Sequence, residues 1–251
     1  MNTDQDNVIC MKWGTKFSAD YVNILARMVR KNLTRPYRFV CFTEDANGLD
    51  ADIEVRPLPQ MDLDAKLPER GWRKLTVFQK TLADLSGRAL FIDLDVLICG
   101  NIDSFFEIDG DFRIIKDWNL PGTYIGNSSI FRFEIGKYPE ILQYYLDNGD
   151  KVRKMVRNEQ AYLSWQMHEK SLLQYWPEDW CCSFKRSCIR PFPMCYLKEA
   201  KRPPKGTKVV IFHGNPNPDA ALKGWHNGSF LRAVKPVRWI QDVWDGKDFD
   251  L

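Results

Sequence analysis

Aspartates separated by a single residue occur at six places in the chain, and one of these pairs has unusual surroundings. Asp93 and Asp95 stand inside FIDLDVLICG (91–100), an otherwise apolar stretch of the kind that forms a buried strand. Ionised carboxylates are costly there unless a partner neutralises them or they coordinate a metal ion. Because residues i and i+2 of a strand project to one side, the two carboxylates should converge at the strand's end. Paired carboxylate oxygens suit Mg²⁺ or Mn²⁺.

A structural interpretation of the same pair remains open, in which Asp93 and Asp95 cap helix N-termini or pair with lysine and arginine. The other five pairs lie in polar or turn-like surroundings, which is typical of solvated surface acids; they are Asp4/Asp6, Asp50/Asp52, Asp62/Asp64, Asp109/Asp111 and Asp248/Asp250.

Strands and helices that alternate along the first half of the chain must position these residues. Apolar runs predict strands over 7–11, 37–42, 53–58, 89–99, 112–116, 127–133 and 208–212. Helical spacing predicts helices over 19–32 (with Ser18 as N-cap), 72–85, 139–148, 159–168 and 239–244. This alternation favours an α/β fold with a mostly parallel sheet, and such sheets bind ligands beyond the carboxyl ends of their strands.

Length and composition are those of an ordinary globular protein. The 251 residues suffice for one large α/β domain, with 44% hydrophobic and 27% charged residues. A net charge of +3 is too small to indicate nucleic-acid binding. The opening MNTDQD lacks the basic and apolar regions of a signal peptide, and no apolar run reaches the roughly 18 residues of a membrane span.

Positive charge and cysteines gather in the second half. Between Cys182 and Lys208, Glu199 is the one acid against eight basic residues: Lys185, Arg186, Arg190, Lys198, Lys201, Arg202, Lys205 and Lys208. This segment could contact an anionic membrane surface or a phosphorylated glycolipid. The seven cysteines show no regular framework, which favours reduced thiols in the cytoplasm. A metal role for Cys181, Cys182, Cys188 and Cys195 is the less favoured alternative.

Several short motifs, taken in order, resemble the GT-A glycosyltransferases, and in particular their retaining, family-8-like branch, the glycogenin and bacterial galactosyltransferase type. The matching segments span residues 7 to 225 and are KWGTKF (12–17), WRKLTVFQ (72–79), FIDLDV (91–96), RIIKDW (113–118), YIGNSSIFRF (124–133), NEQAYL (158–163), KVVIFHGNP (208–216) and KGW (223–225). The chain departs from the family pattern at Glu159, where the family has Asp, and at Gly224, where it has Pro.

The resemblance implies roles for individual residues. It implies that Asp93, Asp95 and His213 bind Mn²⁺ (or Mg²⁺), and that Glu159 and Gln160 are catalytic. The implied nucleotide-binding residues are Lys12, Trp13, Lys74, Asp93, Gly214 and Lys223, and the implied donor-sugar residues are Asp117, Asn127 and Ser128. The Asn-Pro dipeptides at 215–218 predict a loop after His213, which could close over the donor.

The resemblance further implies a single GT-A domain over residues 1–251, with a Rossmann-like, mostly parallel sheet flanked by helices. It would comprise a nucleotide-binding half (about 7–135), an acceptor half with the closing loop (about 136–225) and a tail (226–251). The implied activity is transfer of a hexose from a UDP-sugar to a glycan or glycolipid, with retention, in the cytoplasm or on the inner face of the cell membrane, for a bacterial surface polysaccharide.

Two other functions stay open. A sugar-1-phosphate nucleotidyltransferase also uses strand-end aspartates, but it should carry a Gly-rich basic loop after the first strand, and KWGTKF has one glycine. A catalytically silent sugar- or lipid-binding protein on the same fold would bind without turning over donor.

Overall fold

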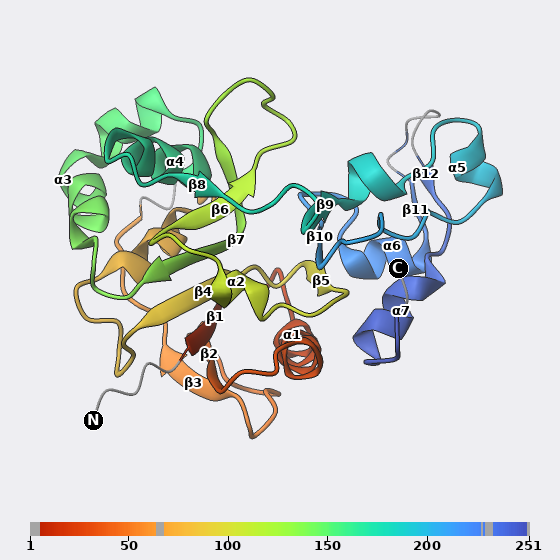
Figure 1. Cartoon of the computed structure of the whole chain (residues 1–251), viewed down its shortest axis with the longest axis horizontal. Coiled ribbons are helices and arrows are strands. Elements are labelled where there is room, and N and C mark those ends of the chain that lie inside the picture. The colour runs from red at the N-terminus through yellow and green to blue at the C-terminus, as the bar shows by residue number, and fades with distance from the viewer. Residues whose placement is uncertain (1–5, 64–67, 227, 229–232, 250–251) are drawn as a thin grey trace.

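The fold is organised around a seven-stranded sheet (Figure 1). The computed structural model describes residues 6–63, 68–226, 228 and 233–249. The strand order is β3-β2-β1-β4-β7-β6-β8. The strands are β1 (Asp6–Lys12), β2 (Tyr37–Thr43), β3 (Glu54–Pro57), β4 (Arg88–Ile92), β6 (Arg113–Lys116), β7 (Gly126–Glu134) and β8 (Gln174–Tyr175). Only β7 runs antiparallel to its neighbours, which confirms the predicted α/β fold with a mostly parallel sheet.

The sheet is buried on both faces, and this explains the nearly continuous apolar runs. Along β1, Val8 and Cys10 face one hydrophobic cluster, whereas Ile9 and Met11 face the other. Helix α1 (Ala19–Asn32) packs into the first cluster. The second cluster contains side chains of helices α3 (Pro139–Met155) and α4 (Glu159–Glu169) and of the 3₁₀ segment η1 (Trp72–Phe78).

A second, three-stranded sheet lies beside the first (Figure 1). It has the order β5-β10-β9, formed by β5 (Val96–Ile98), β10 (Val209–Ile211) and β9 (Cys181–Ser183). The prediction of one strand over 89–99 is therefore wrong. The chain leaves the large sheet after Ile92 and re-enters a strand, in the small sheet, at Val96. Asp93 and Asp95 stand in the linker between the two sheets, rather than on a continuous strand.

The helix predicted over 72–85 is also wrong, because helical structure ends at Phe78. Residues from Lys74 to Phe78 are buried in succession, and Trp72 is buried too, whereas an amphipathic helix would bury only one side. The backbone becomes extended at Gln79, with φ −61° and ψ 149°. The tight 3₁₀ turn thus reflects burial all around the segment.

The remaining predicted helices are present. The bounds of α1 match the prediction, and Ser18 occupies the N-cap position, although its side chain makes no capping hydrogen bond. Helix α3 runs beyond the predicted Asn148, where its backbone departs from helical geometry. Helix α4 is capped by Asn158, whose Oδ1 accepts from the backbone N–H of Ala161 at 3.2 Å. Helix α7 (Arg238–Trp244) begins one residue before its predicted start.

Short elements that the sequence did not predict complete the structure. They are α2 (Ser104–Glu107), the π-helical η2 (Phe184–Cys188), α5 (Met194–Leu197), α6 (Pro218–Lys223), β11 (Trp225–His226) and β12 (Ala233–Val234). The predicted loop after His213 is confirmed as far as Asn217, the N-cap residue of α6. The Tyr21 hydroxyl donates to Asp219 Oδ1 at 2.5 Å and so ties α6 to α1.

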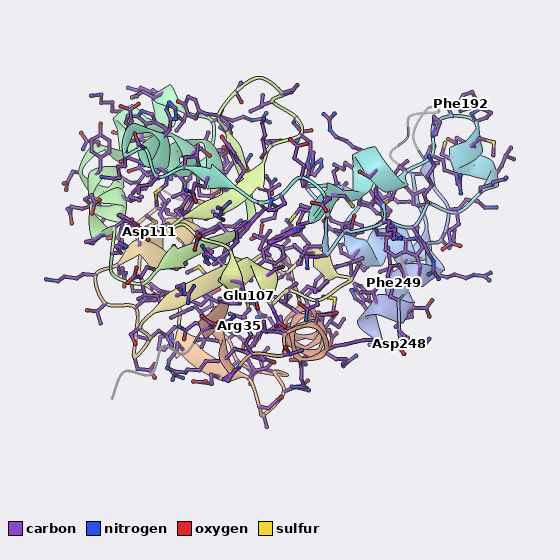
Figure 2. The ribbon with its side chains drawn as sticks, in the orientation of Figure 1. Arg35, Glu107, Asp111, Phe192, Asp248 and Phe249 are labelled. Atoms are coloured by element: carbon purple, nitrogen blue, oxygen red, sulfur yellow. The ribbon has the colours of Figure 1, made fainter. Side chains whose placement is uncertain are left out.

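Ion pairs join elements at the amino end of β1. Arg35 Nε lies 2.7 Å from Asp6 Oδ2, and its Nη1 lies 3.6 Å from Glu107 Oε1 at the end of α2 (Figure 2). All seven cysteines are buried and free. None of the helices within the described ranges is long and apolar enough to cross a membrane.

Candidate active site

A cavity of ≈ 510 Å³ lies where several strands of the large sheet end. Ten of the thirteen residues singled out from the sequence line it: Trp13, Lys74, Asp93, Asp95, Asn127, Ser128, Glu159, Gln160, His213 and Gly214. These residues come from six separate stretches of the chain. The structure therefore brings most of the predicted set together at the carboxyl ends of parallel strands, the usual ligand position in such sheets.

Strand direction explains why these stretches meet. Strands β1 and β4 are parallel, so Trp13 and Asp93, which follow them, lie at one edge. Strand β7 runs antiparallel to β4, so its first residues, including Asn127 and Ser128, reach that same edge. A backbone hydrogen bond of 2.8 Å from Asp93 N to Ser129 O continues this pairing. The loop after β10 brings His213 to the same cavity.

Lys74 forms the principal ion pair of the cavity. Its Nζ lies 2.6 Å from Asp93 Oδ1 and 2.8 Å from Asp93 Oδ2. Burial by itself would lower the pKa of Lys74, but the charges of Asp93 and Glu159 prevail and raise it above its ordinary value. Lys74 is therefore positively charged at neutral pH and neutralises Asp93.

Asp95 has no such partner, since no lysine or arginine in the described part of the chain forms an ion pair with it. Burial, and then the charge of Asp93, raise its pKa to about 7, although Lys16 and Lys74 act in the opposite direction. Asp93 and Asp95 stand one residue apart in the linker, and of the two only Asp93 is ion-paired among the described residues. Carboxylate oxygens that lack a cationic partner are suitable ligands for a divalent cation.

His213 does not complete a metal site in this structure. Among the described residues, no three histidine, cysteine, aspartate or glutamate side chains converge to hold a metal ion. The His213 Nε2 atom is hydrogen-bonded to Ser183 Oγ at 2.6 Å, and its ring stacks on Trp118 at 6.1 Å between centroids. Burial, followed by Lys185, lowers its pKa, so its imidazole is neutral at pH 7. In this structure the candidate metal ligands are thus Asp93 and Asp95.

Glu159 and Gln160 enter the cavity from the first turn of α4. Glu159 is 3% exposed, and its Oε1 has no hydrogen-bond partner. Burial raises its pKa to about 7, against the lowering effects of Lys74 and Ser128. Gln160 Nε2 donates to Asp117 Oδ2 at 3.0 Å, so Asp117 lies behind Gln160 and not on the cavity wall. An unpartnered carboxylate oxygen beside oriented amide and hydroxyl groups is suited to a polar ligand.

Two predicted nucleotide-binding residues are absent from the cavity wall. Lys12 is buried at the end of β1 and its Nζ donates to Asp45 O at 3.4 Å. Lys223 is exposed at the end of α6. Their roles, like that of Asp117, stay predictions.

The structure also adds wall residues that sequence reasoning missed, namely Met11, Lys16, Phe17, Glu69, Arg70, Gly71, Leu94, Ser129, Arg157, Asn158 and Phe212. Lys16 and Phe17 belong to the KWGTKF loop, so the position of that loop after the first strand was a usable signal. Glu69, Arg70 and Gly71 precede η1 and reach the wall only through the fold.

Comparison with known proteins supports the fold. The sequence matches no protein-family model and no curated protein. The structure resembles the galactosyltransferase LgtC, crystallised with donor and acceptor sugar analogs, with a TM-score of 0.62 and 12% identity over 98% of this chain and 97% of that one. It also resembles the glycosyltransferase GlyE of Streptococcus pneumoniae TIGR4, with a TM-score of 0.59 and 11% identity over 98% of this chain and 62% of that one. The chain has the GT-A fold. Similarity at this level of identity concerns the fold alone, so the activity must be argued from the cavity.

Gly71 supports the position of Glu159, and this gives a first prediction. A Cβ added at Gly71 would lie 2.7 Å from Glu159 Oε2, whereas a Cβ at Gly122 would meet nothing within 4 Å. The two glycines have similar φ angles of 81° and 83°, so alanine pays the same backbone cost, about 1 kcal/mol, at either position. We expect Gly71→Ala to lower the free energy of unfolding by about 1–2 kcal/mol more than Gly122→Ala. Equal losses in urea unfolding would contradict the contact.

The buried carboxyl of Glu159 gives a second prediction. Its pKa rises from 4.5 to about 7 on folding, so the folded protein binds a proton that the unfolded chain releases between these pH values. Glu159 therefore costs stability as pH rises through this range, and the full cost persists above pH 7. We expect Glu159→Gln to stabilise the protein by about 2 kcal/mol at pH 8 and by little at pH 4. Urea unfolding at the two pH values measures this, with the exposed Glu169→Gln on the same helix as the control.

Proposed function

We propose that this protein is a metal-dependent glycosyltransferase that moves a hexose from a UDP-sugar to a glycan or glycolipid acceptor, with retention at the anomeric carbon. The observation that carries this proposal is the cavity at the strand ends. There the half-buried Asp95 has no ion-pair partner among the described residues, and Glu159 presents an unpartnered carboxylate oxygen in the same cavity. Glycosyltransferases of known structure share the fold that positions these groups.

Asp93 and Asp95 are the residues that would hold the cation, with Mn²⁺ favoured and Mg²⁺ as the second candidate. When bound, the cation supplies Lewis acidity that stabilises the negative charge of a departing diphosphate. Lys16 and Lys74 add positive charge near the aspartates, and they lower the pKa of Asp95 for this reason. Trp13 offers an aromatic surface for the nucleotide base at the end of β1. His213 would need to leave Ser183 before it could join the aspartates as a ligand.

The opposite charge develops on the sugar ring, and Glu159 is placed to meet it. Its ionised carboxylate would stabilise the oxocarbenium-like centre or act as the nucleophile. Gln160 would orient the sugar, since its own amide is held by Asp117. Asn127 and Ser128, on the adjacent strand end, are available to bind sugar hydroxyls. Burial of Glu159 keeps its pKa near 7, so the fraction of active carboxylate would rise between pH 6 and 8.

The alternative functions have less support from the structure. A nucleotidyltransferase needs free backbone N–H groups after the first strand for phosphate. In this chain the Gly14 N–H donates instead to Glu44 Oε1 at 2.8 Å. A catalytically silent binding protein would have no need for a buried carboxylate with an unpartnered oxygen, because that arrangement costs stability.

The basic segment 182–208 bears on the cellular setting. The protein would transfer sugar to a bacterial surface polysaccharide in the cytoplasm, in peripheral contact with the membrane. The positive charge of residues 182–208 agrees with such a contact. Some of its cations are used internally, however: Lys185 donates to His213 O at 2.6 Å, Arg186 to Asn119 Oδ1 at 3.0 Å and Arg190 to Glu199 O at 2.7 Å. Exposed lysines such as Lys198 and Lys205 are the better membrane candidates.

Donor hydrolysis tests the proposed function directly. The purified protein should slowly hydrolyse at least one of a panel of UDP- and GDP-sugars when Mn²⁺ is present, and EDTA should abolish the reaction. Release of UDP or GDP measures turnover, and the configuration of the released sugar, followed by NMR, tests retention. Binding of UDP without hydrolysis of any donor would instead favour a silent binding protein.

Asp95 gives a sharper test of the metal assignment. We expect Asp95→Asn to abolish Mn²⁺-dependent binding of UDP in calorimetry, because one of two carboxylate ligands is lost, while the fold stays intact. Loss of one of two like charges should leave thermal unfolding unchanged or shifted upward. The exposed Asp109→Asn, from another aspartate pair, is the matched control. Unchanged UDP affinity in Asp95→Asn would exclude Asp95 as a metal ligand.

A further inference from the structure

A second, smaller cavity of ≈ 210 Å³ adjoins the first and is lined mostly by arginine. Its walls are Pro68, Arg70, Trp72, Arg153 and Arg157. Arg70 and Arg157 line both cavities, so the two spaces share a border. The smaller space, here called the arginine pocket, received no role from the sequence or from the proposed donor chemistry.

The arginine pocket has a rigid floor. The rings of Trp72 and Tyr145 stack with 4.7 Å between centroids and 19° between planes. The Arg153 guanidinium lies over both rings, 5.1 Å from the centroid of Trp72 and 5.8 Å from that of Tyr145. Arg153 Nη1 also donates to Pro68 O at 3.3 Å. Stacking on aromatic faces restrains this guanidinium before any ligand arrives.

The backbone around Arg70 is unusual in a way that supports a binding role. Arg70 has a positive φ of 46°, which residues other than glycine rarely adopt, and the following Gly71 has a φ of 81°. Such conformations cost about 1 kcal/mol or more and cluster at functional sites. Here the turn directs Arg70 to the border of the two cavities, where its Nη1 donates to Arg157 O at 2.8 Å. Arg157 itself lies two residues before Glu159.

Charge in the arginine pocket is not balanced by the protein. Across the described residues, no carboxylate forms an ion pair with the guanidinium of Arg70, Arg153 or Arg157, whereas Arg30, Arg35, Arg38 and Arg56 are all paired. Glu69 is adjacent in sequence, but its carboxylate accepts from the backbone N–H groups of Gly71 and Arg73 at 2.9 and 3.0 Å. The pocket therefore carries three positive charges with free hydrogen-bonding capacity.

We propose that the arginine pocket binds a phosphate monoester on the acceptor sugar. The proposal rests on the proposed function, since it names the acceptor class of the same site. A phosphate monoester carries a charge of about −1.5 to −2 and three acceptor oxygens, and so matches three guanidinium groups better than a carboxylate does. The donor diphosphate has its own place at Asp93 and Asp95. Glu159 lies between these aspartates and the arginine pocket, because it interacts with Lys74 on one side and borders Gly71 on the other.

Calorimetry with galactose 6-phosphate, galactose and glucuronate tests this proposal, both without UDP and with UDP and Mn²⁺ at saturation. We expect galactose 6-phosphate to bind best of the three. The double variant Arg153→Gln/Arg157→Gln should weaken its binding by about tenfold or more, because charge-assisted hydrogen bonds are lost. The matched control is Lys151→Gln/Lys154→Gln, which removes the same charge from exposed positions at the end of α3, the helix that carries Arg153, outside the pocket. The control should change the affinity by less than about twofold.

Arg157→Gln alone guards against a folding defect. Arg153 packs on the aromatic floor and its loss could loosen the structure, whereas the exposed Arg157 makes no such ring contact. Weakened binding of galactose 6-phosphate in Arg157→Gln, with unchanged thermal unfolding, supports the pocket. Unchanged binding in this variant, equal binding of galactose, or tighter binding of glucuronate would overturn the assignment.

Two further measurements distinguish binding of a phosphorylated sugar from failure of the proposed function and from binding of a lipid headgroup. If wild-type protein fails to bind UDP with Mn²⁺ or to hydrolyse any donor, the proposed function fails, but the arginine-dependent binding measured without UDP still stands or falls by itself. Sedimentation with vesicles of phosphatidylcholine and phosphatidic acid tests a lipid headgroup as the source of phosphate. Vesicle binding that requires Arg157, in the absence of galactose 6-phosphate binding, would overturn the sugar assignment.

Discussion

The buried ion pair between Lys74 and Asp93 is the interaction on which the site depends. It joins η1 to the end of β4 and so fixes the segment that carries Arg70, Gly71 and Trp72. Buried ion pairs pay a large desolvation cost, and they often contribute little net stability compared with apolar residues of the same shape. What this pair supplies is position. Lys74 also lowers the pKa of Glu159 through its charge. One ammonium group therefore interacts with both the aspartate linker and the candidate catalytic carboxylate.

The cavity combines groups whose charges the protein leaves partly uncompensated. Asp95 retains negative charge, Glu159 has an unpartnered oxygen, and the arginine pocket retains positive charge. Each of these would be costly in a structural core. By contrast, Arg38 and Arg56 on the surface are paired with Glu54 and Asp84. The uncompensated groups border one another, which is the pattern expected where ligands supply the missing partners.

Much of the fold followed from local patterns, because strands buried on both faces and an amphipathic α1 leave clear signals in the sequence. The candidate site residues came from the family resemblance instead, and ten of the thirteen line one cavity. The wrong strand and helix predictions, over 89–99 and 72–85, arose where tertiary packing determines the secondary structure. The sequence FIDLDVLICG does not by itself distinguish one strand from two strands in different sheets. The segment WRKLTVF has helical spacing, but it is buried on nearly all sides and forms a 3₁₀ helix. The arginine pocket could not be predicted from the sequence, because residue 70 is distant from residues 153 and 157 and no motif includes these arginines.

The split of 89–99 into two strands has a mechanical consequence. The three residues from Asp93 to Asp95 are a covalent link between the sheets, and they also hold the uncompensated carboxylates of the cavity. The loop with His213 leaves the small sheet at the end that meets this link, because Ile211 of β10 pairs with Val96 of β5. A ligand in the cavity therefore contacts residues carried by both sheets, so its binding depends on how the two sheets are held relative to one another.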